Sequence, residues 1–178
     1  TVVKKVNWHK DSATLTDTKG HTFSAKKVII TVPLSVLQAE VITFEPSLPA
    51  VTQAAKKMGI GAVIKVLIEF STAFWESDEV AKSVGKSLAD VGFILSEEAI
   101  PTWWTQYPEK TALLTGWLGG PKAGAYKDAP DETVLEMAVN SLAAIFKVPA
   151  TFLTQQLIAW KVANWTADVY IRGSYSYA

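Results

Sequence analysis

The N-terminal third of the chain alternates short apolar and polar runs, and this pattern predicts strands separated by turns. The predicted strands of this region are residues 3–6, 13–16 and 21–23, with a polar turn at residues 17–20. Residues 27–32 (KVIITV) form a continuous run rich in β-branched residues that Pro33 ends. Such a run predicts a strand that is buried and leads into a turn.

Apolar residues recur at helical spacing in three later segments. Residues 51–58 place an apolar face on one side of a predicted helix, which Gly59 ends. Residues 80–88 predict a second helix, weakened by Gly85. The third is predicted to start near Asp128, whose carboxylate is expected to cap it, and to run to residue 146.

The second half of the chain also contains strand-like runs. They are residues 62–68, 92–95, 111–118 and 156–162, followed by an extended segment from residue 170. Strands and helices do not alternate regularly, so the sequence predicts an α+β fold. We expect a mixed, largely antiparallel sheet flanked by helices, in a single domain that covers residues 1–178.

Composition narrows the class of protein. Of the 178 residues 49% are hydrophobic and 19% are charged, which is typical of an ordinary globular protein. The 17 basic residues equal the 17 acidic ones, so no overall field favours a nucleic-acid partner. The longest apolar runs are too short for a membrane span. The absence of cysteine excludes thiolate chemistry and disulfides, and favours a cytoplasmic location over secretion.

The two ends of the sequence predict that this is a piece of a longer protein. The chain begins at Thr1 without an initiator methionine and enters a predicted strand at once. It stops at the residues GSYSYA, which form neither a helix cap nor a polar tail. The absence of a targeting segment therefore carries no information.

Lys65 is the residue that most strongly suggests a functional site. It is the one charged residue in the segment 62–68 (AVIKVLI), whose other six residues are apolar. An ammonium is costly to bury, so its head must reach a polar cavity or water. The alternative to a site is a lysine whose stem lies on apolar surface while its head is solvated.

Most sequence motifs of catalytic and nucleotide sites are absent. No GxGxxG or phosphate-binding loop occurs, and no serine lies in a GxSxG elbow. The chain has only two histidines, His9 and His21, both in hairpin-like segments, so we expect no metal site. Asn164 begins a formal glycosylation triplet, a pattern that arises often by chance.

An ordered series of segments remains, and together they resemble the flavin-containing amine oxidase family of monoamine and polyamine oxidases. The segments are, in order, KKVIITVPLSVL, ITFEPSLP, MGIGAVIKVLIEFSTAFW, PTWW, LLTGWLGGPKA, NW and GSYSY. The resemblance covers nearly the whole chain and is weakest at residues 77–87. It implies that this is the central, substrate-binding part of such an enzyme, and that the glycine-rich FAD-binding fingerprint lies upstream in the FAD-binding domain of the parent chain.

The resemblance also implies roles for individual residues. Lys65 matches the family lysine that holds a water against the flavin, and Trp165 matches a tryptophan near the flavin ring, although a core or interface role is an open alternative. Tyr175 matches one wall of the aromatic cage around the substrate amine. Whether Trp103, Trp104 or Trp117 lines the cavity stays open; a core position is expected for each.

Two further positions concern the cofactor. Val3 matches a family position whose backbone contacts the adenine part of FAD; taken alone, it is a strand valine. Ser174 stands where monoamine oxidases carry the cysteine that binds FAD covalently. This departure from the family pattern implies that FAD is bound non-covalently in the full-length protein. Because the FAD-binding fingerprint would lie upstream, the resemblance also implies that this chain alone holds FAD poorly, if at all.

The implied reaction is the oxidation of a small-molecule amine to an imine, which water hydrolyses to an aldehyde, while dioxygen is reduced to hydrogen peroxide. The chain alone is expected to be inactive. One alternative is a related FAD oxidoreductase, such as a desaturase, that uses the same scaffold without amine chemistry. The other is a non-catalytic binding module that kept the fold and lost the cofactor.

Overall fold

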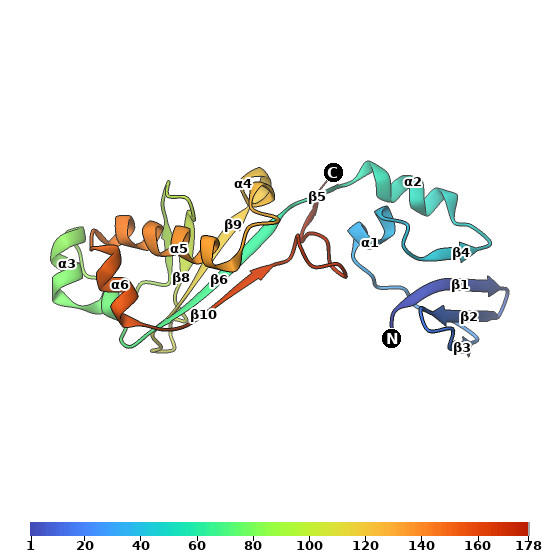
Figure 1. The fold of residues 1–178 in the computed structure, drawn as a ribbon, viewed down its shortest axis with the longest axis horizontal. Coiled ribbons are helices and arrows are strands. Elements are labelled where there is room, and N and C mark those ends of the chain that lie inside the picture. The colour runs from blue at the N-terminus through green and yellow to red at the C-terminus, as the bar shows by residue number, and fades with distance from the viewer. Residues whose placement is uncertain (178) are drawn as a thin grey trace. The chain divides into compact units, whose positions relative to one another are not determined.

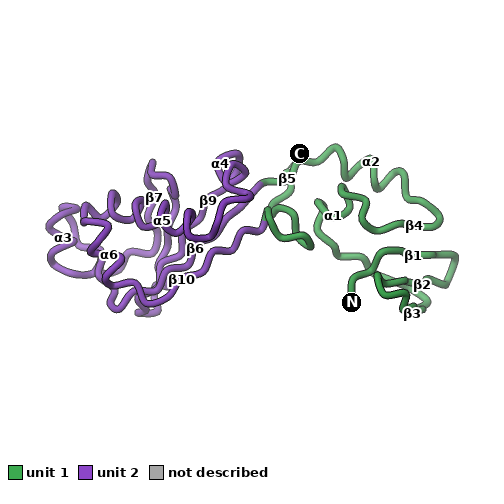
Figure 2. The backbone as a smooth tube through the Cα atoms, in the orientation of Figure 1, with its two compact units in different colours: residues 1–61, 166–178 green, residues 62–165 purple. Residues whose placement is uncertain are grey.

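The computed structural model describes residues 1–177, which form two compact units (Figure 2). The first contains Thr1–Gly61 and the described residues from Thr166 onward, and the second is Ala62–Trp165. The sequence predicts a single domain over residues 1–178, and this stays a prediction. Each unit is described below by itself.

The first unit contains a small sheet whose strands follow the predicted hairpins. Its strands are β1 (Val3–His9), β2 (Ser12–Asp17), β3 (Thr22–Ala25) and β4 (Thr43–Glu45), in the order β3-β2-β1-β4 (Figure 1). The first three are antiparallel, as the alternating pattern predicts, and β4 runs parallel to β1. Val6 of β1 lies opposite Leu15 and Phe44 and is buried.

Two short helices and a second strand pair complete this unit. Helix α1 (Leu34–Gln38) was not predicted, whereas α2 (Pro49–Lys57) confirms the helix expected over residues 51–58. Ala55 is the buried residue of α2, while Val51 and Met58 are exposed. Strand β5 (Gly59–Ile60) pairs antiparallel with β11 (Ser176–Tyr177).

The prediction of a buried strand over residues 27–32 is wrong. The backbone there joins no strand in residues 1–177, and the side chain of Ile29 is 88% exposed. A β-branched run becomes a strand only where another strand accepts its hydrogen bonds, and the sheet ends at β3 and β4 without pairing to it. The exposed residues Ile29 and Ile30 are therefore an apolar surface without cover in the described chain.

The second unit is built on an antiparallel sheet. Its strands are β6 (Val63–Phe70), β7 (Phe93–Leu95), β8 (Thr102–Trp104), β9 (Leu113–Gly119) and β10 (Leu157–Asn164), in the order β10-β6-β9-β8-β7. The sequence predicts all of these except β8. Because β6 lies second from one edge, it pairs with β10 on one side and with β9 on the other.

Helices pack on one face of this sheet (Figure 1). They are the short helix η1 (Phe74–Glu76), α3 (Asp78–Val84), α4 (Gly120–Ala125), α5 (Asp131–Phe146) and α6 (Ala150–Gln156). The sequence predicts α3 and α5 but not α4 or α6. Within residues 1–177 no single helix is long and apolar enough to cross a membrane; α5 and α6 pass that test only as a pair bent by 116°.

The predicted cap of α5 is wrong in one respect. The N-cap position is occupied by Pro130, with φ −56° and ψ 146°, and no side chain caps it. Asp128 lies two residues earlier, outside the cap position. The proline ring fixes φ in the range that this position uses, so the helix starts without a capping carboxylate. Asp131 and Glu132 still lie in the first turn, where acidic residues suit the helix dipole.

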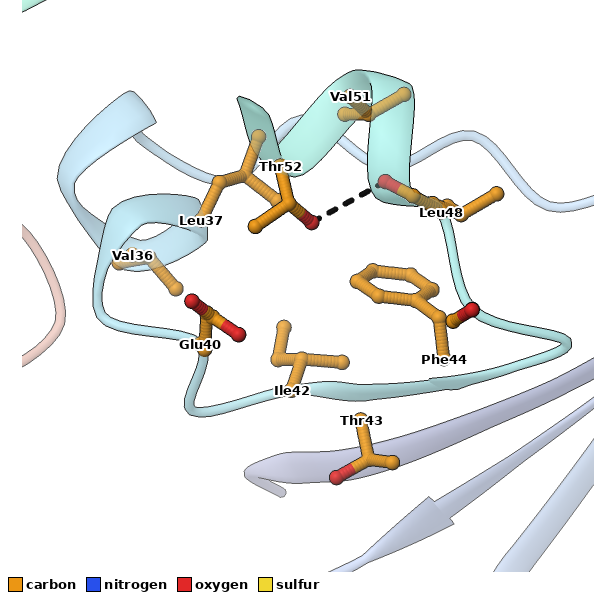
Figure 3. Close-up of a pocket in the computed structure, with 10 residues that line it drawn as sticks. Val36, Leu37, Glu40, Ile42, Thr43, Phe44, Leu48, Val51 and Thr52 are labelled. Atoms are coloured by element: carbon orange, nitrogen blue, oxygen red, sulfur yellow. Dashed lines mark hydrogen bonds between the residues drawn. The ribbon is translucent and has the colours of Figure 1, made fainter. Parts of the chain in front are cut away.

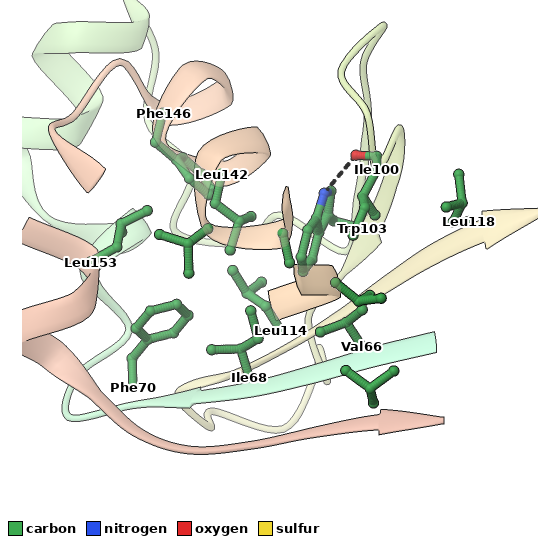
Figure 4. Packing of buried hydrophobic residues seen from close by; sticks show 14 of the residues in the cluster. Val66, Ile68, Phe70, Ile100, Trp103, Leu114, Leu118, Leu142, Phe146 and Leu153 are labelled. Atoms are coloured by element: carbon green, nitrogen blue, oxygen red, sulfur yellow. Dashed lines mark hydrogen bonds between the residues drawn. The ribbon is translucent and has the colours of Figure 1, made fainter. Parts of the chain in front are cut away.

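The core of the second unit lies between the sheet and these helices (Figure 4). Every second residue of β6 points into it, and Ile64, Val66 and Ile68 are fully buried. The indole of Trp103 is also buried, and its Nε1 donates to the carbonyl of Ile100 at 2.9 Å. On the other face of β6, Lys65 and Leu67 are only half-buried and Glu69 is exposed.

Candidate functional site

The second face of the sheet in the second unit carries Lys65. Directly opposite residues of antiparallel strands point to the same side, and Lys65 lies opposite Trp117 of β9 and Ala163 of β10. One strand further, Trp104 of β8 lies opposite Thr115 of β9. These side chains share the face that the helices leave uncovered. We call it the open face, defined by Lys65, Trp104, Thr115 and Trp117.

Lys65 is half-buried, and its ammonium lies beside an aromatic ring. Its Nζ is 5.8 Å from the centroid of the Trp104 ring, within the range of a cation–π interaction. Within residues 1–177, Lys65 forms no ion pair with a carboxylate. Within residues 1–177 the ammonium of Lys65 therefore has no carboxylate partner, although the exposed residues Glu69 of β6 and Lys161 of β10 lie on the same side of the sheet.

The three tryptophans whose positions the sequence left open divide between the two faces. Trp103 is a core residue, as expected. Trp104 and Trp117 are half-buried on the open face, so the core position expected for them is wrong. The ring of Trp117 lies over Gly119 of its own strand, where a β-carbon would overlap it. The alternation of residues along β9 could have predicted the position of Trp117. Leu114, Gly116 and Leu118 face the core, so Trp117 between them faces the other side.

A polar pair completes the open face. Thr115 is 6% exposed, and its hydroxyl accepts a hydrogen bond from Nε2 of Gln106 at 3.5 Å. Sequence reasoning missed both residues, because a threonine in a strand carries no distinctive signal. Around Lys65 the face is thus mostly aromatic, with the hydroxyl of Thr115 and the amide of Gln106 as neutral polar groups, an arrangement suited to a flat ligand with few polar atoms.

Trp165 belongs to the same unit as Lys65. It follows β10 directly and is half-buried, and the preceding residue Asn164 lies opposite Ile64 of the strand that carries Lys65. The side-chain amide of Asn164 donates to the carbonyls of Tyr126 and Lys127, at 3.2 and 2.9 Å. These two bonds fix the point at which the chain leaves the sheet and so fix the start of the turn at Trp165.

Ser174 and Tyr175 are held in the first unit by backbone hydrogen bonds. The N–H of Ser174 donates to the carbonyl of Gly61 at 2.9 Å, and the N–H of Gly61 donates to the carbonyl of Tyr175 at 2.7 Å. Both side chains are exposed, and Tyr175 is 59% exposed. Val3, at the start of β1, lies opposite Asp17 in the same unit. The structure therefore groups Lys65 with Trp165, and Ser174 with Tyr175, in different units.

Two hollows in the first unit contain none of the predicted site residues. One, of about 200 Å³, lies between α1, α2 and β4 and is drawn in Figure 3. Its one charged lining residue, Glu40, forms an ion pair with Lys56. The other, of about 520 Å³, is open; its lining includes the apolar residues Trp8, Ile29 and Ile30 and also the titratable residues His9, Asp11, Lys26 and Lys27.

Comparison with known protein families gives a match along the whole chain. The family model described as "Flavin containing amine oxidoreductase" matches residues 1–178. Polyamine oxidase 4 of Oryza sativa subsp. japonica is 31% identical over 175 residues, which cover 98% of this chain and 33% of that protein. The bovine (Bos taurus) peroxisomal N(1)-acetyl-spermine/spermidine oxidase is 29% identical, over 89% of this chain and 32% of that protein. The human (Homo sapiens) lysine-specific histone demethylase 2 is 25% identical, over 98% and 21%. This chain thus spans about a third or less of the length of these relatives.

Solved structures show the same fold. Wild-type putrescine oxidase bound to putrescine superposes with a TM-score of 0.73 at 22% identity, over 98% of this chain and 36% of that one. Cyclohexylamine oxidase from Brevibacterium oxydans IH-35A gives a TM-score of 0.73 at 21% identity, with the same coverage. At these identities the likeness establishes the fold alone, and it confirms the predicted α+β class with its mixed, largely antiparallel sheets and flanking helices.

Proposed function

Because this chain belongs to the family of flavin-containing amine oxidoreductases, we propose that it is the substrate-binding part of an FAD-dependent enzyme that oxidises a small-molecule amine. One observation supports this beyond family membership. The open face joins Lys65, which forms no ion pair with a carboxylate within residues 1–177, to the two half-buried rings of Trp104 and Trp117. No purely structural role requires a cation and two tryptophans on an uncovered sheet face.

The residues of the open face fit one part of the cofactor. A flavin ring is planar and largely apolar, with hydrogen-bonding atoms along its edge, and tryptophan rings beside one ammonium suit such a ligand. Within residues 1–177 no GxGxxG turn lies between a strand and a helix to hold a diphosphate. We therefore expect this chain to contact the flavin ring and, through the backbone at Val3, the adenine portion of FAD, and the FAD-binding domain of the parent chain to hold the diphosphate.

When bound, FAD supplies the two-electron acceptor that takes a hydride equivalent from the Cα–H bond of the amine and passes the electrons to dioxygen. The amine becomes an imine, which water hydrolyses to an aldehyde and ammonia or a smaller amine. Lys65 holds a water molecule through its N–H donors at the flavin edge. In the described part of the chain it forms no ion pair with a carboxylate that would compete for those donors.

The aromatic residues bind and desolvate the amine. Trp104 and Trp117 on the open face exclude water, and a dry aromatic site without an opposing carboxylate favours the neutral, reactive amine. Tyr175 forms one wall of the cage around the amine nitrogen, and its exposed ring is available for that contact. Trp165 packs near the flavin, and the backbone at Val3 contacts the adenine portion.

Ser174 governs how the cofactor is attached. Its hydroxyl does not form the thioether that a cysteine forms with a flavin, so FAD is bound non-covalently. Trichloroacetic acid precipitation of the parent protein should therefore leave all of the flavin in the supernatant. Flavin that stays with the precipitated protein contradicts this proposal.

The exposed residues Ile29 and Ile30 support a partner for this chain. They border the open hollow of about 520 Å³, together with Trp8. Exposed apolar residues that gather beside a hollow are typical of an interaction surface. We propose that the FAD-binding domain of the parent covers this surface, with residues 27–32 adding a strand to its sheet.

The full-length parent protein tests the proposal most simply. Purified, it should be yellow with flavin absorption bands, and it should release hydrogen peroxide from at least one amine in a panel of polyamines, primary amines and amino acids. A colourless parent favours a non-catalytic binding module, and a yellow parent that produces no peroxide from any amine favours a desaturase-like oxidoreductase. This chain alone, as the matched control, should produce no peroxide.

A further inference from the structure

The ammonium of Lys65 is held to one side of its strand. Its neighbour on β10, Ala163, is too small to support the lysine stem. Its neighbour on β9 is Trp117, whose ring lies along its own strand over Gly119. The head of Lys65 extends away from β10 and across β9 to the ring of Trp104, which lies two strands away from β6. The contact that fixes the charged end is therefore with an aromatic face.

Trp104 is itself firmly placed. Its ring lies 6.0 Å from that of Phe93, at an interplanar angle of 36°, on the neighbouring strand β7. The preceding residue, Trp103, is buried in the core on the other side of the sheet and is hydrogen-bonded to Ile100. The strand that carries Trp104 therefore has one side anchored in the core while the other presents the ring to Lys65.

An aromatic ring positions an ammonium in a way that a carboxylate does not. A carboxylate accepts one or more of the three N–H bonds of a lysine, whereas the face of an indole attracts the cation without occupying a particular donor. Lys65 keeps its donors for a water molecule while the direction of its side chain is fixed. The interaction corresponds to roughly a 2- to 30-fold preference for this arrangement over others.

We infer that Trp104 is a positioning residue for Lys65: its ring holds the ammonium in place so that the lysine can present a bound water to the flavin during reoxidation by dioxygen. This inference rests on the proposed function, because it assigns Trp104 a role only through Lys65. It adds a residue whose effect on the oxygen reaction is indirect and separable from any contact with the amine.

A double-mutant cycle in the full-length parent tests the inference. The proteins are the parent, Lys65→Met, Trp104→Leu and the double variant, and the measurement is the rate at which the reduced flavin reacts with dioxygen. We expect Trp104→Leu to slow this rate roughly 2- to 30-fold in the parent and to have no further effect in the Lys65→Met background. Trp104→Phe, which keeps an aromatic face, should restore most of the rate.

Trp117→Leu is the matched control. Trp117 lies on the same face and has a similar half-buried ring, but the ammonium is not over it. Because Trp117 lies directly opposite Lys65, the two positions are expected to couple, but we expect this coupling to be smaller than that between Trp104 and Lys65, and an equal coupling contradicts the particular role of Trp104. If Trp104→Leu slows the reaction equally in both backgrounds, Trp104 acts independently of Lys65 and the inference is overturned.

Failure of the inference and failure of the proposed function give different results. An unchanged oxygen rate in Lys65→Met removes Lys65 from the mechanism, and with it the role of Trp104. If Lys65→Met slows the oxygen reaction and the effect of Trp104→Leu on the rate is simply additive to it, only the role of Trp104 is removed. Urea unfolding of the same four proteins gives a readout without catalysis: we expect a non-zero coupling between positions 65 and 104, and strictly additive unfolding free energies contradict the contact.

Discussion

The ring of Trp103 occupies the space that a side chain at Gly116 would need. The two residues lie directly opposite each other on β8 and β9, and a β-carbon at Gly116 would come within 2.7 Å of the indole. Both are buried, and Trp103 is further fixed by its hydrogen bond to Ile100. A glycine on β9 is thus what allows a tryptophan to enter the core at this point.

Gly116→Ala should therefore destabilise the second unit. The added methyl group forces the ring of Trp103 or the strand to shift, and overpacking of this kind costs about 1–3 kcal/mol. Urea unfolding measures the change. Gly92→Ala is the matched control, because a β-carbon there meets nothing within 4 Å. Equal stabilities of the two variants contradict the packing described for Trp103.

The hydroxyl of Ser141 joins α5 to the loop before β8. Ser141 is 1% exposed; its Oγ donates to the carbonyl of Met137 at 2.9 Å and accepts from the N–H of Ile100 at 3.1 Å. Ser141→Ala leaves the buried N–H of Ile100 without this acceptor, and we expect a loss of about 1–3 kcal/mol in the free energy of unfolding.

Ser83→Ala is the control for that loss. Ser83 makes a similar bond to the carbonyl of Glu79 within α3, but it is exposed and joins no second segment. Its replacement should change the free energy of unfolding by less than about 0.5 kcal/mol. The account of Ser141 fails if both serines prove equally dispensable.

Asp17 makes the first unit sensitive to acid. Burial alone would raise the pKa of its carboxyl group, but hydrogen bonds from the side chain of His21 and from the backbone N–H groups of His21 and Lys19 outweigh it and lower the pKa below the ordinary value. A lowered folded-state pKa contributes stability that is present above the unfolded pKa of about 3.9 and lost as pH falls through the folded value.

Asp17→Asn should accordingly remove a pH-dependent part of the stability. We expect the difference in unfolding free energy between the original chain and Asp17→Asn to be largest above about pH 5 and to shrink steadily towards pH 2. Urea unfolding followed at several pH values measures it. A difference that stays constant over this range shows that the hydrogen bonds of Asp17 do not favour its ionised form.

Gly173 sets the direction of the segment that carries Ser174 and Tyr175. Its φ of +140° is one that residues with a side chain rarely adopt, and a β-carbon there would overlap the side chain of Ile60. Gly173→Ala should weaken the hydrogen bonds between this segment and Gly61, seen as faster amide exchange at Gly61.

Gly20→Ala is the control that separates backbone strain at positive φ from the steric overlap with Ile60. Gly20 has a φ of +87°, but a β-carbon there meets nothing within 4 Å. Its replacement should cost only the backbone strain, about 1 kcal/mol, and leave exchange at Gly61 unchanged. If Gly173→Ala behaves in the same way, the overlap with Ile60 is relieved easily and the glycine does not orient the segment.

The sequence predicted the elements whose own residues determine them. The alternating strands of the first hairpins, β6 and the long amphipathic α5 follow from local periodicity. It missed α1, α4 and α6, which have five to seven residues and no strong periodic signal. It also predicted a strand at residues 27–32, because β-branched composition indicates strand propensity but not the presence of a pairing neighbour.

The candidate site was predictable only in part. The single charge in an apolar strand indicated that Lys65 belongs to a site. The sequence does not show which face of the sheet Lys65 lies on, because the residues on both sides of this strand are apolar. The grouping of Lys65 with Trp104 and Trp117 follows from strand order and register, which depend on contacts distant in sequence. Resemblance to a family supplied Trp165, Ser174 and Tyr175, whose local sequence contains no comparable signal.

The role of Lys65 is tested most directly by the reaction of the reduced parent protein with dioxygen in a stopped-flow instrument. Lys65→Met should keep FAD and react about 10²-fold more slowly, because it removes the group that holds the water. Lys82→Met, which removes an exposed lysine of α3, should react at the original rate. A Lys65→Met protein that retains FAD and reacts as fast as the Lys82→Met control contradicts the account.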